Sequence, residues 1–280
     1  MSRPNALGEY LRARRELIDP AQAGLHVLGV RRTPGLRREE VATLAGISAD
    51  YYLRLEQGRD RNPSPQVLEA LARVLRLDAT ATQHLLSLTA ARPAAARRRS
   101  RREVVPVGVR QLLEVINVPA FVESRSFEVL AANRPAMALS PNFRPGVNRL
   151  RAVFLDPDEQ ALYPDWEQTI RNMVAGFRTS VGNDVDDPRI VQLVGELSLA
   201  SERFRKLWAR HDVTALAGGT FRLLHPEAGM LELRREKLPL ADADGQILAI
   251  YHAEQGSATA RALAGLAARA TFPEGDAASA

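Results

Sequence analysis

Cysteine is absent from the 280-residue chain, which excludes a disulfide framework, a thiolate metal site and thiol redox chemistry. Lysine is almost absent too, since Lys206 and Lys237 are the only two and arginine supplies the remaining positive charge. No apolar run approaches the ~18 residues that a membrane helix needs, and the first residues lack the apolar segment of a signal peptide. We therefore expect a cytoplasmic protein with no membrane partner.

The charge is distributed unevenly between the two parts of the chain. Residues 1–103 contain 19 arginines and 11 acidic residues, a net charge of +8, whereas residues 104–280 contain 19 basic and 22 acidic residues, a net charge of −3. A chain of this length predicts two domains. We expect a polyanionic partner for the first part only.

Residues 37–58 have the pattern of two short helices joined by a tight turn. Val41, Ala42, Leu44 and Ala45 form an apolar stripe at helical spacing, and Gly46 can adopt the left-handed conformation that ends a helix. Ser48 is a favoured N-cap for the next helix, which Ile47, Tyr52 and Leu55 would bury on one side. The pattern favours a DNA-reading helix-turn-helix over an ordinary helical hairpin, because arginines cluster around it.

The exposed face of the second of these helices is the expected DNA contact. Ala49 can meet a thymine methyl, Asp50 can accept from cytosine or support the helix dipole, and Arg54 can read guanine or hold phosphate. Glu56 is expected to pair with an arginine of its own domain. The full set of predicted DNA contacts is Arg31, Arg32, Arg37, Arg38, Ala49, Asp50, Tyr51, Arg54 and Arg59.

Apolar periodicity and turn residues divide the chain into four segments. Residues 1–91 predict an all-α domain of five helices, and residues 92–103 a basic linker that is a tether or a DNA-gripping arm. Residues 104–270 predict an α+β domain with an antiparallel sheet, and 271–280 a polar tail. In the α+β domain we expect helices at 109–116, 135–139, 166–181, 189–199, 202–208 and 257–269, and strands at 119–122, 126–131, 220–225, 229–240 and 246–254. A hairpin turn is expected at 242–245.

Catalytic and metal-binding motifs are missing from the sequence. The five histidines have no metal-ligand spacing, and there is no Gly-x-Ser-x-Gly elbow, phosphate loop or Gly-x-Gly-x-x-Gly. We therefore expect no enzymatic activity, no metal and no cofactor.

The chain resembles the MmyB-like helix-turn-helix regulators, a branch of the Xre and Cro repressor family. Segments 31–42, 51–59 and 63–68 carry the resemblance in the first part, and segments 154–157, 162–167, 193–198, 204–213 and 225–229 extend it through the second. The resemblance implies transcriptional control and a PAS-like C-terminal domain around an apolar cavity for a small lipophilic ligand such as a fatty acid.

Aromatic and polar residues of the second part are candidates for that cavity, although each also has an ordinary structural interpretation, as a core aromatic or a satisfied hydrogen bond. The predicted ligand contacts are Phe121, Asn133, Trp166, Trp208, Arg222, His225 and Tyr251. A single small reading module has limited affinity, so we expect a homodimer on an inverted-repeat operator. The alternative is a C-terminal domain that binds no ligand and serves only dimerisation or protein interaction.

Overall fold

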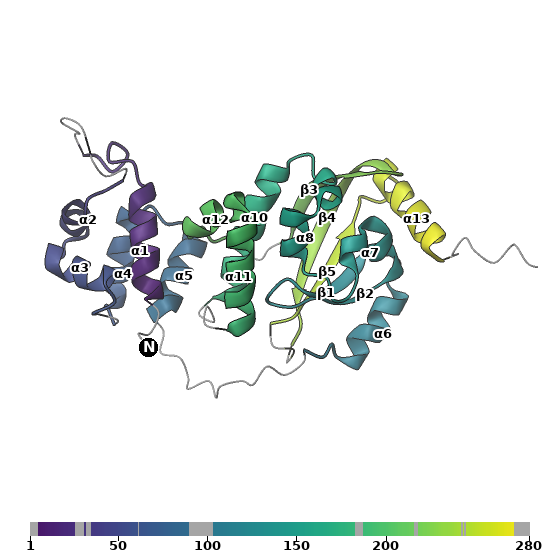
Figure 1. The fold of residues 1–280 in the computed structure, drawn as a ribbon, viewed down its shortest axis with the longest axis horizontal. Helices are drawn as coiled ribbons and strands as arrows, with labels where there is room; N and C mark the ends of the chain where they lie inside the picture. Colours follow the sequence, from purple (N-terminus) through teal and green to yellow (C-terminus); the bar gives the residue numbers. More distant parts are fainter. Residues whose placement is uncertain are drawn as a thin grey trace, which may run out of the picture. The chain divides into compact units, whose positions relative to one another are not determined.

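The computed structural model describes residues 5–25, 31, 35–60, 62–89, 103–182, 187–215, 218–241, 243 and 245–271. These residues form two compact units. The first contains the described part of 1–97 together with Val174–Ala215, and the second contains the described part of 98–173 and 216–280. Figure 1 gives the labels of the helices and strands.

Five helices make up the N-terminal region, as predicted: α1 (Ala6–Leu17), α2 (Arg38–Ala45), α3 (Ala49–Glu56), α4 (Pro65–Val74) and α5 (Ala79–Thr89). The Ser48 and Ser64 side chains cap α3 and α4 by accepting backbone N–H groups. Gly46 takes a φ of 70° between α2 and α3, a left-handed conformation that glycine adopts without strain. This sharp turn sets the angle between the two helices.

The N-terminal core gathers apolar side chains from all five helices, with Tyr10, Leu11, Tyr52 and Leu55 almost fully buried. Leu44, a member of the apolar stripe of α2, is 42% exposed. It lies in the last turn of α2, where it lines a surface groove with residues of α4 instead of entering the core.

A close approach between α1 and the end of α3 requires a small residue in α1. A Cβ on Gly8 would lie 2.2 Å from the Glu56 carbonyl oxygen. Asn5 secures the same contact, because its Oδ1 accepts from the Gly8 N–H at 3.1 Å and its Nδ2 donates to the Glu56 carbonyl at 2.6 Å. One side chain therefore caps α1 and ties it to α3.

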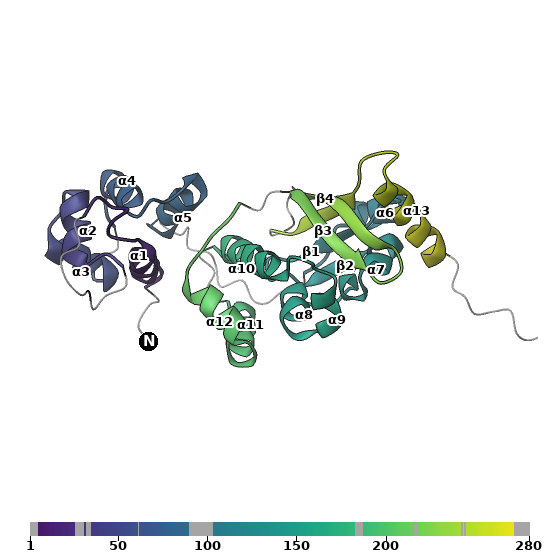
Figure 2. The ribbon, with the colours of Figure 1, turned by 90° about the horizontal axis from the view of Figure 1, so that it is seen from above.

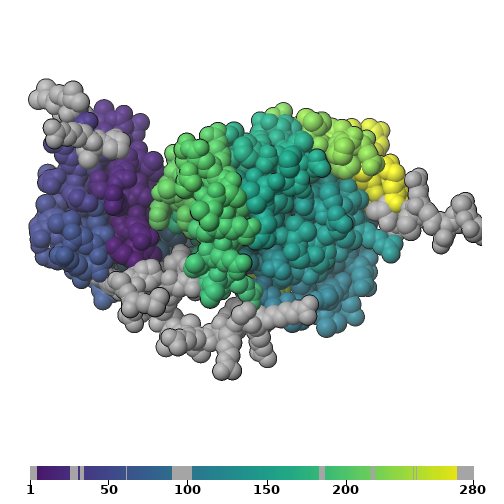
Figure 3. All heavy atoms as spheres, viewed as in Figure 1, coloured from purple at the N-terminus to yellow at the C-terminus, as the bar shows by residue number. Residues whose placement is uncertain are grey.

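Three later helices continue the chain: α10 (Trp166–Val181), α11 (Pro188–Ala200) and α12 (Glu202–Ala209). The division expected from the sequence places all of 104–270 in one domain, whereas Val174–Ala215 is compact with the N-terminal helices. An ion pair between Arg14 of α1 and Asp212, just after α12, joins them. In the space-filling view, the green surface of this segment adjoins the purple surface of α1 (Figure 3).

The second unit is built on a five-stranded antiparallel sheet, which confirms the predicted fold class. The strand order is β2-β1-β5-β4-β3. Its strands are β1 (Ala120–Glu123), β2 (Val129–Ala132), β3 (Gly219–His225), β4 (Gly229–Pro239) and β5 (Ile247–His252). The β3–β4 hairpin forms one edge of the sheet, with β5 beside β4 and β1 beyond it (Figures 1 and 2). Its helices are α6 (Val107–Val115), α7 (Arg134–Leu139), η1 (Pro141–Phe143), α8 (Arg149–Leu155), α9 (Pro157–Ala161) and α13 (Ala258–Thr271).

The short helices η1, α8 and α9 are absent from the sequence prediction. Each is seven residues or shorter, too short to show a helical period, and each begins at a local cap: Ser140, Asn148 and Asp156 accept backbone N–H groups. The basic linker, except Glu103, and residues 272–280 lie outside the described residues, as do two positions of the hairpin turn expected at 242–245.

Side chains alternate between the two faces of the sheet. Ala120, Val122 and Leu248 face α6 on one side, within a cluster that includes Leu113. Phe121 and Tyr251 belong to the opposite face, where their rings stack at 5.8 Å and meet Phe143 of η1. Figure 1 shows α6 and α13 on one side of the sheet and α8 on the other. Both faces are therefore covered.

A buried ion cluster lies among the aromatic rings. Arg149 Nη1 is 2.6 Å from Glu123 Oε2, and Lys237 Nζ is 3.2 Å from Glu123 Oε1. The Arg149 guanidinium also lies over the Phe121 and Phe143 rings at 4.9 and 5.1 Å. Burial raises the pKa of Glu123, but the neighbouring cations outweigh it and hold the pKa below its usual value. The carboxylate therefore stays ionised inside the domain.

Replacement of Arg149 by Met should destabilise the chain by about 3 kcal/mol, because it leaves a buried carboxylate with one cation instead of two. Arg151→Met, at an exposed position of the same helix, is the matched control and should change stability by less than about 0.5 kcal/mol. Urea unfolding followed by circular dichroism measures both variants. Equal midpoints for the two would contradict the assignment.

Candidate DNA interface and ligand pocket

Helix α3 presents an exposed face made of predicted reading residues. Ala49, Asp50 and Arg54 are exposed and Tyr51 is half-buried, while Tyr52 and Leu55 enter the core. Leu53 of the same helix is half-buried. The face that remains is small and polar, which suits the major groove.

Arginine side chains surround this face at the start of α2 and after α3. Arg37, Arg38 and Arg59 are exposed. Arg31 differs, because its guanidinium makes a two-pronged contact with Glu40 at 2.9 and 2.6 Å and donates to the Gly35 carbonyl at 3.1 Å. Its contacts tie Arg31 to Gly35 and to Glu40 of α2. Arg32 lies outside the described residues.

Within α3, Arg54 forms an ion pair with Asp50 one turn earlier, and its guanidinium lies 5.7 Å from the centre of the Tyr51 ring. Both charged side chains are exposed, so the pair contributes little to stability. Its effect is to restrict the directions in which Arg54 points. Three of the predicted DNA contacts are therefore one connected group.

Glu56, at the end of α3, anchors this helix to α1 and α2. Its carboxylate accepts from Arg15 Nε of α1 and from Arg38 Nε of α2, both at 2.6 Å. Burial raises the pKa of Glu56, but the bonds from the two arginines outweigh it and keep the pKa below its usual value. The prediction that Glu56 pairs within its own domain is confirmed.

The seven predicted ligand residues do not form one cluster. Phe121 and Tyr251 are stacked in the core of the second unit. Trp166 belongs to the same unit and donates from Nε1 to the Val153 carbonyl at 3.1 Å. Trp208 belongs to the other compact unit.

The three polar candidates have protein partners. Arg222 is exposed and pairs with Asp165 at 2.7 Å. His225 Nε2 lies 3.0 Å from the Ala138 carbonyl, and its Nδ1 accepts two backbone N–H groups of the following turn. Asn133 accepts the Ala120 and Ala136 N–H groups and donates to the Ile116 and Val118 carbonyls. These bonds use the hydrogen-bonding capacity of Asn133 completely.

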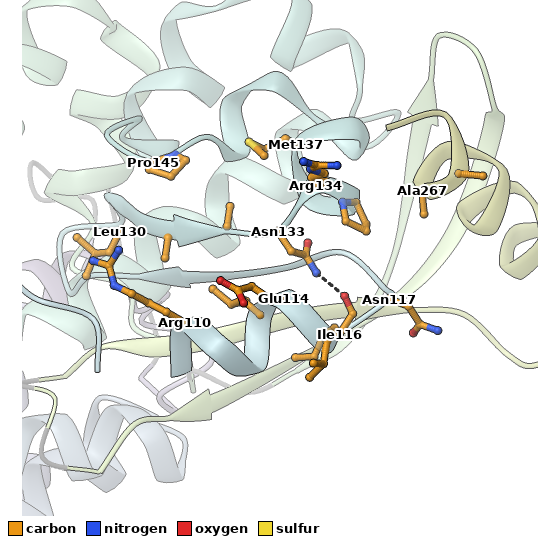
Figure 4. Close-up of a pocket in the computed structure, with 16 residues that line it drawn as sticks. Arg110, Glu114, Ile116, Asn117, Leu130, Asn133, Arg134, Met137, Pro145 and Ala267 are labelled. Atoms are coloured by element: carbon orange, nitrogen blue, oxygen red, sulfur yellow. Dashed lines mark hydrogen bonds between the residues drawn. The ribbon is translucent and has the colours of Figure 1, made fainter. Parts of the chain in front are cut away.

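A pocket of about 900 Å³ lies in the second unit beside the edge strand β2. Its size is within the range of small-molecule sites. Figure 4 shows α6 on one side of the pocket and α7 on the other, with Ala267 of α13 beyond. Apolar side chains line it together with three charged ones; among them are Leu113, Ile116, Leu130, Met137, Arg110, Glu114 and Arg134.

Of the predicted ligand residues, only Asn133 lines this pocket. The predicted set consists of aromatic residues and of polar residues near strands, and it omits the charged side chains of α6 and α7. Arg110 and Glu114 are four residues apart in a helix, and this spacing is the signal that could have placed them on one face.

No helix in the described part of the chain is long and apolar enough to cross a membrane. Among the same residues, no group of three or more His, Asp or Glu side chains could hold a metal ion.

The helical hairpin with its exposed arginine-rich face, followed by a domain with a pocket, defines a helix-turn-helix regulator with a ligand-binding domain. Residues 6–85 match a family described as a helix-turn-helix domain. Residues 105–266, more than half of the chain, match the MmyB-like transcription regulator ligand binding domain. The chain therefore belongs to the MmyB-like transcription regulators. Comparison with the curated proteins gave no match.

Acid should destabilise the DNA-binding helices through Glu56. Because its folded-state pKa lies below the ordinary value of 4.5, its stabilising contribution is present above pH ~4.5 and is lost as pH falls through the folded value. At pH 7, Glu56→Gln should cost about 3 kcal/mol, since it leaves Arg15 and Arg38 without their counter-charge. Thermal unfolding between pH 3 and 7 measures this, with exposed Glu39→Gln as the control. A pH dependence unchanged by Glu56→Gln would contradict the role of Glu56.

Proposed function

We propose that this regulator binds an inverted-repeat operator as a homodimer and that a small lipophilic ligand, fatty-acid-like in chemistry, tunes this binding from the C-terminal domain. The membership of a DNA-binding and ligand-binding family makes the general activity plain. The observation that carries the finer proposal is the Asp50–Tyr51–Arg54 group on α3, whose two charged side chains are exposed, on a helix that Glu56 fixes to α1 and α2.

The reading face supports sequence-specific contact because it combines an arginine with a restricted direction and small neighbours. A guanidinium placed in the major groove can make two hydrogen bonds to guanine, and Ala49 leaves room for a thymine methyl. Arg37 and Arg38 at the start of α2 suit phosphate contacts, which fix the register of the reading helix without selecting sequence. One eight-residue helix reads few bases, which favours two copies on two half-sites.

The pocket beside β2 supports a ligand with an apolar body and an acidic end. Leu113, Leu130 and Met137 provide apolar contacts, and Arg110 and Arg134 provide positive charge at the wall. A ligand alters operator binding only if it binds the two states of the protein with different affinity.

Replacement of Arg54 by Ala should weaken operator binding about 10-fold or more and relax the base preference at one position of each half-site. The operator is obtained first by selecting random-sequence duplexes with the wild-type chain, and affinities are then measured at fixed salt by fluorescence anisotropy. Arg12→Ala, an exposed arginine of α1, is the control. An unchanged affinity and base preference in Arg54→Ala would remove α3 from the reading role.

Filling the pocket should abolish the response to ligand without abolishing DNA binding. Saturated fatty acids from octanoic to palmitic acid are tested for their effect on melting temperature and on operator affinity. A ligand present at 100 times its Kd stabilises the wild type by about 2.7 kcal/mol. Met137→Trp should remove this shift, because the indole occupies the space between α6 and α7.

Leu238→Trp is the control for added bulk, since Leu238 is half-exposed on β4 and outside the pocket lining. A wild-type melting temperature that ignores the whole panel, with no small molecule in a solvent extract of the purified protein, would favour the alternative of a dimerisation domain without ligand.

A further inference from the structure

Helix α1 of the DNA-binding region is held by residues that follow α12. Arg14 Nη1 lies 2.5 Å from Asp212 Oδ1, and Asp212 Oδ2 accepts from Arg210 Nε at 2.7 Å. The Arg14 side chain is 19% exposed and that of Asp212 is 34% exposed, so solvent screens the pair only in part. An ion pair between residues 198 positions apart in sequence joins the reading domain to the end of α12.

Aromatic side chains extend this contact beside the ion pair. The Tyr10 ring of α1 meets the His84 ring of α5 at 5.1 Å and the His211 ring at 6.4 Å, in both cases edge to face. Burial lowers the pKa of His84 to about 4, and burial together with Arg178 lowers that of His211 to about 3. Both imidazoles are therefore neutral at physiological pH, and His211 Nδ1 can accept from Arg178 Nη1 at 3.2 Å.

Arg178, near the end of α10, contacts His211 and Trp208. Its guanidinium carbon is 3.7 Å from the centre of the Trp208 ring, and its Nη2 donates to the Trp208 carbonyl at 2.5 Å. Burial lowers the pKa of Arg178 to about 10, so the group remains a cation at neutral pH. Among the residues that the structure describes, no carboxylate lies at salt-bridge distance from this buried cation, and its carbonyl, imidazole and ring contacts compensate for the lost water. We call Arg178, Trp208, His211 and Asp212 the seat.

The backbone at the seat is strained. His211 has a φ of 54° directly after the C-cap of α12, a position where glycine or asparagine is usual. A left-handed conformation costs a residue with a side chain about 1 kcal/mol. The histidine places a ring against Tyr10 and Arg178, which glycine in the same conformation would not do. Local strain of this kind is typical of functional positions.

Helix α10 connects the seat to the ligand-binding domain. It runs without interruption from Trp166 to Val181, and the boundary between the compact units falls inside it, between Met173 and Val174. Its first half carries Trp166, which is bonded to Val153 of α8, and its second half carries Arg178 of the seat. One helix therefore contributes to both units.

We propose that the seat is the intramolecular partner of the DNA-binding domain. Through the seat, the C-terminal domain positions the DNA-binding domain. This inference rests on the homodimer of the proposed function. When Arg14 and Tyr10 contact the seat, each DNA-binding domain of the dimer is fixed to α10–α12 before it binds DNA. When Arg14 and Tyr10 leave the seat, the two DNA-binding domains of a dimer are no longer fixed and must be ordered when the dimer binds a two-half-site operator. This lowers the effective concentration of the second DNA-binding domain at the second half-site.

Charge reversal with rescue tests the docking directly. Arg14→Glu and Asp212→Arg each place like charges together, and the double variant restores the pair in reverse. In a Trp166→Phe background, Trp208 is the only tryptophan of the full chain and reports on the seat. Each single variant should shift its emission, and the double variant should return it. Glu202→Arg, which alters an exposed pair of α12, is the control.

Operator binding tests the consequence. The single variants should lose about 10-fold or more in affinity for the two-half-site operator and keep their affinity for an isolated half-site, while the double variant recovers. His211→Gly should also lose affinity for the two-half-site operator and keep its affinity for an isolated half-site. Its thermal stability should not fall, since glycine relieves the backbone strain but removes the ring. A purely structural role of His211 would leave two-site binding unchanged.

The outcomes separate the two proposals. Single variants with wild-type emission and wild-type two-site affinity, or a double variant that does not recover, would overturn the role of the seat. A wild-type chain that binds one half-site and two half-sites equally well would overturn the homodimer, and the Trp208 emission of the charge-reversal set would still decide whether the head is docked.

Discussion

The buried carboxylate of Glu56 is the interaction on which the reading domain depends. It binds one arginine from α1 and one from α2 while standing at the end of α3, so a single anion fixes three helices at their common meeting point. Asn5 and Gly8 bring the same end of α3 against α1. The exposed face of α3 therefore has a direction set from inside the domain, as recognition of base edges requires.

The second unit also contains a buried glutamate that pairs with two cations from different elements. Glu123 meets Arg149 from a helix and Lys237 from another strand of the sheet, and aromatic rings enclose the ions. Such clusters contribute uncertainly to stability but strongly disfavour arrangements that leave one member unpaired. The cluster therefore restricts the movement of β1, β4 and α8, which carry its members, when a ligand enters the pocket beside the edge strand β2.

Much of the fold follows from the sequence, because long amphipathic helices and alternating strands carry their own periodicity. The bounds of α10 are predicted to the residue, and Gly46 and Ser48 identify the turn between α2 and α3. The pocket and the seat are harder to predict from the sequence. Arg178 and His211 are 33 positions apart, and no local pattern states that a buried arginine will lie on Trp208.

The completely bonded side chain of Asn133 has a consequence for how the pocket can respond to its contents. Its four bonds join two carbonyls after α6, the strand β1 and the first turn of α7, and both α6 and α7 contribute residues to the pocket lining. A molecule that forces α6 away from α7 must break these bonds or move β1 with them. Since β1 is paired on both sides in the sheet, the wall resists gradual opening and favours a small number of discrete shapes.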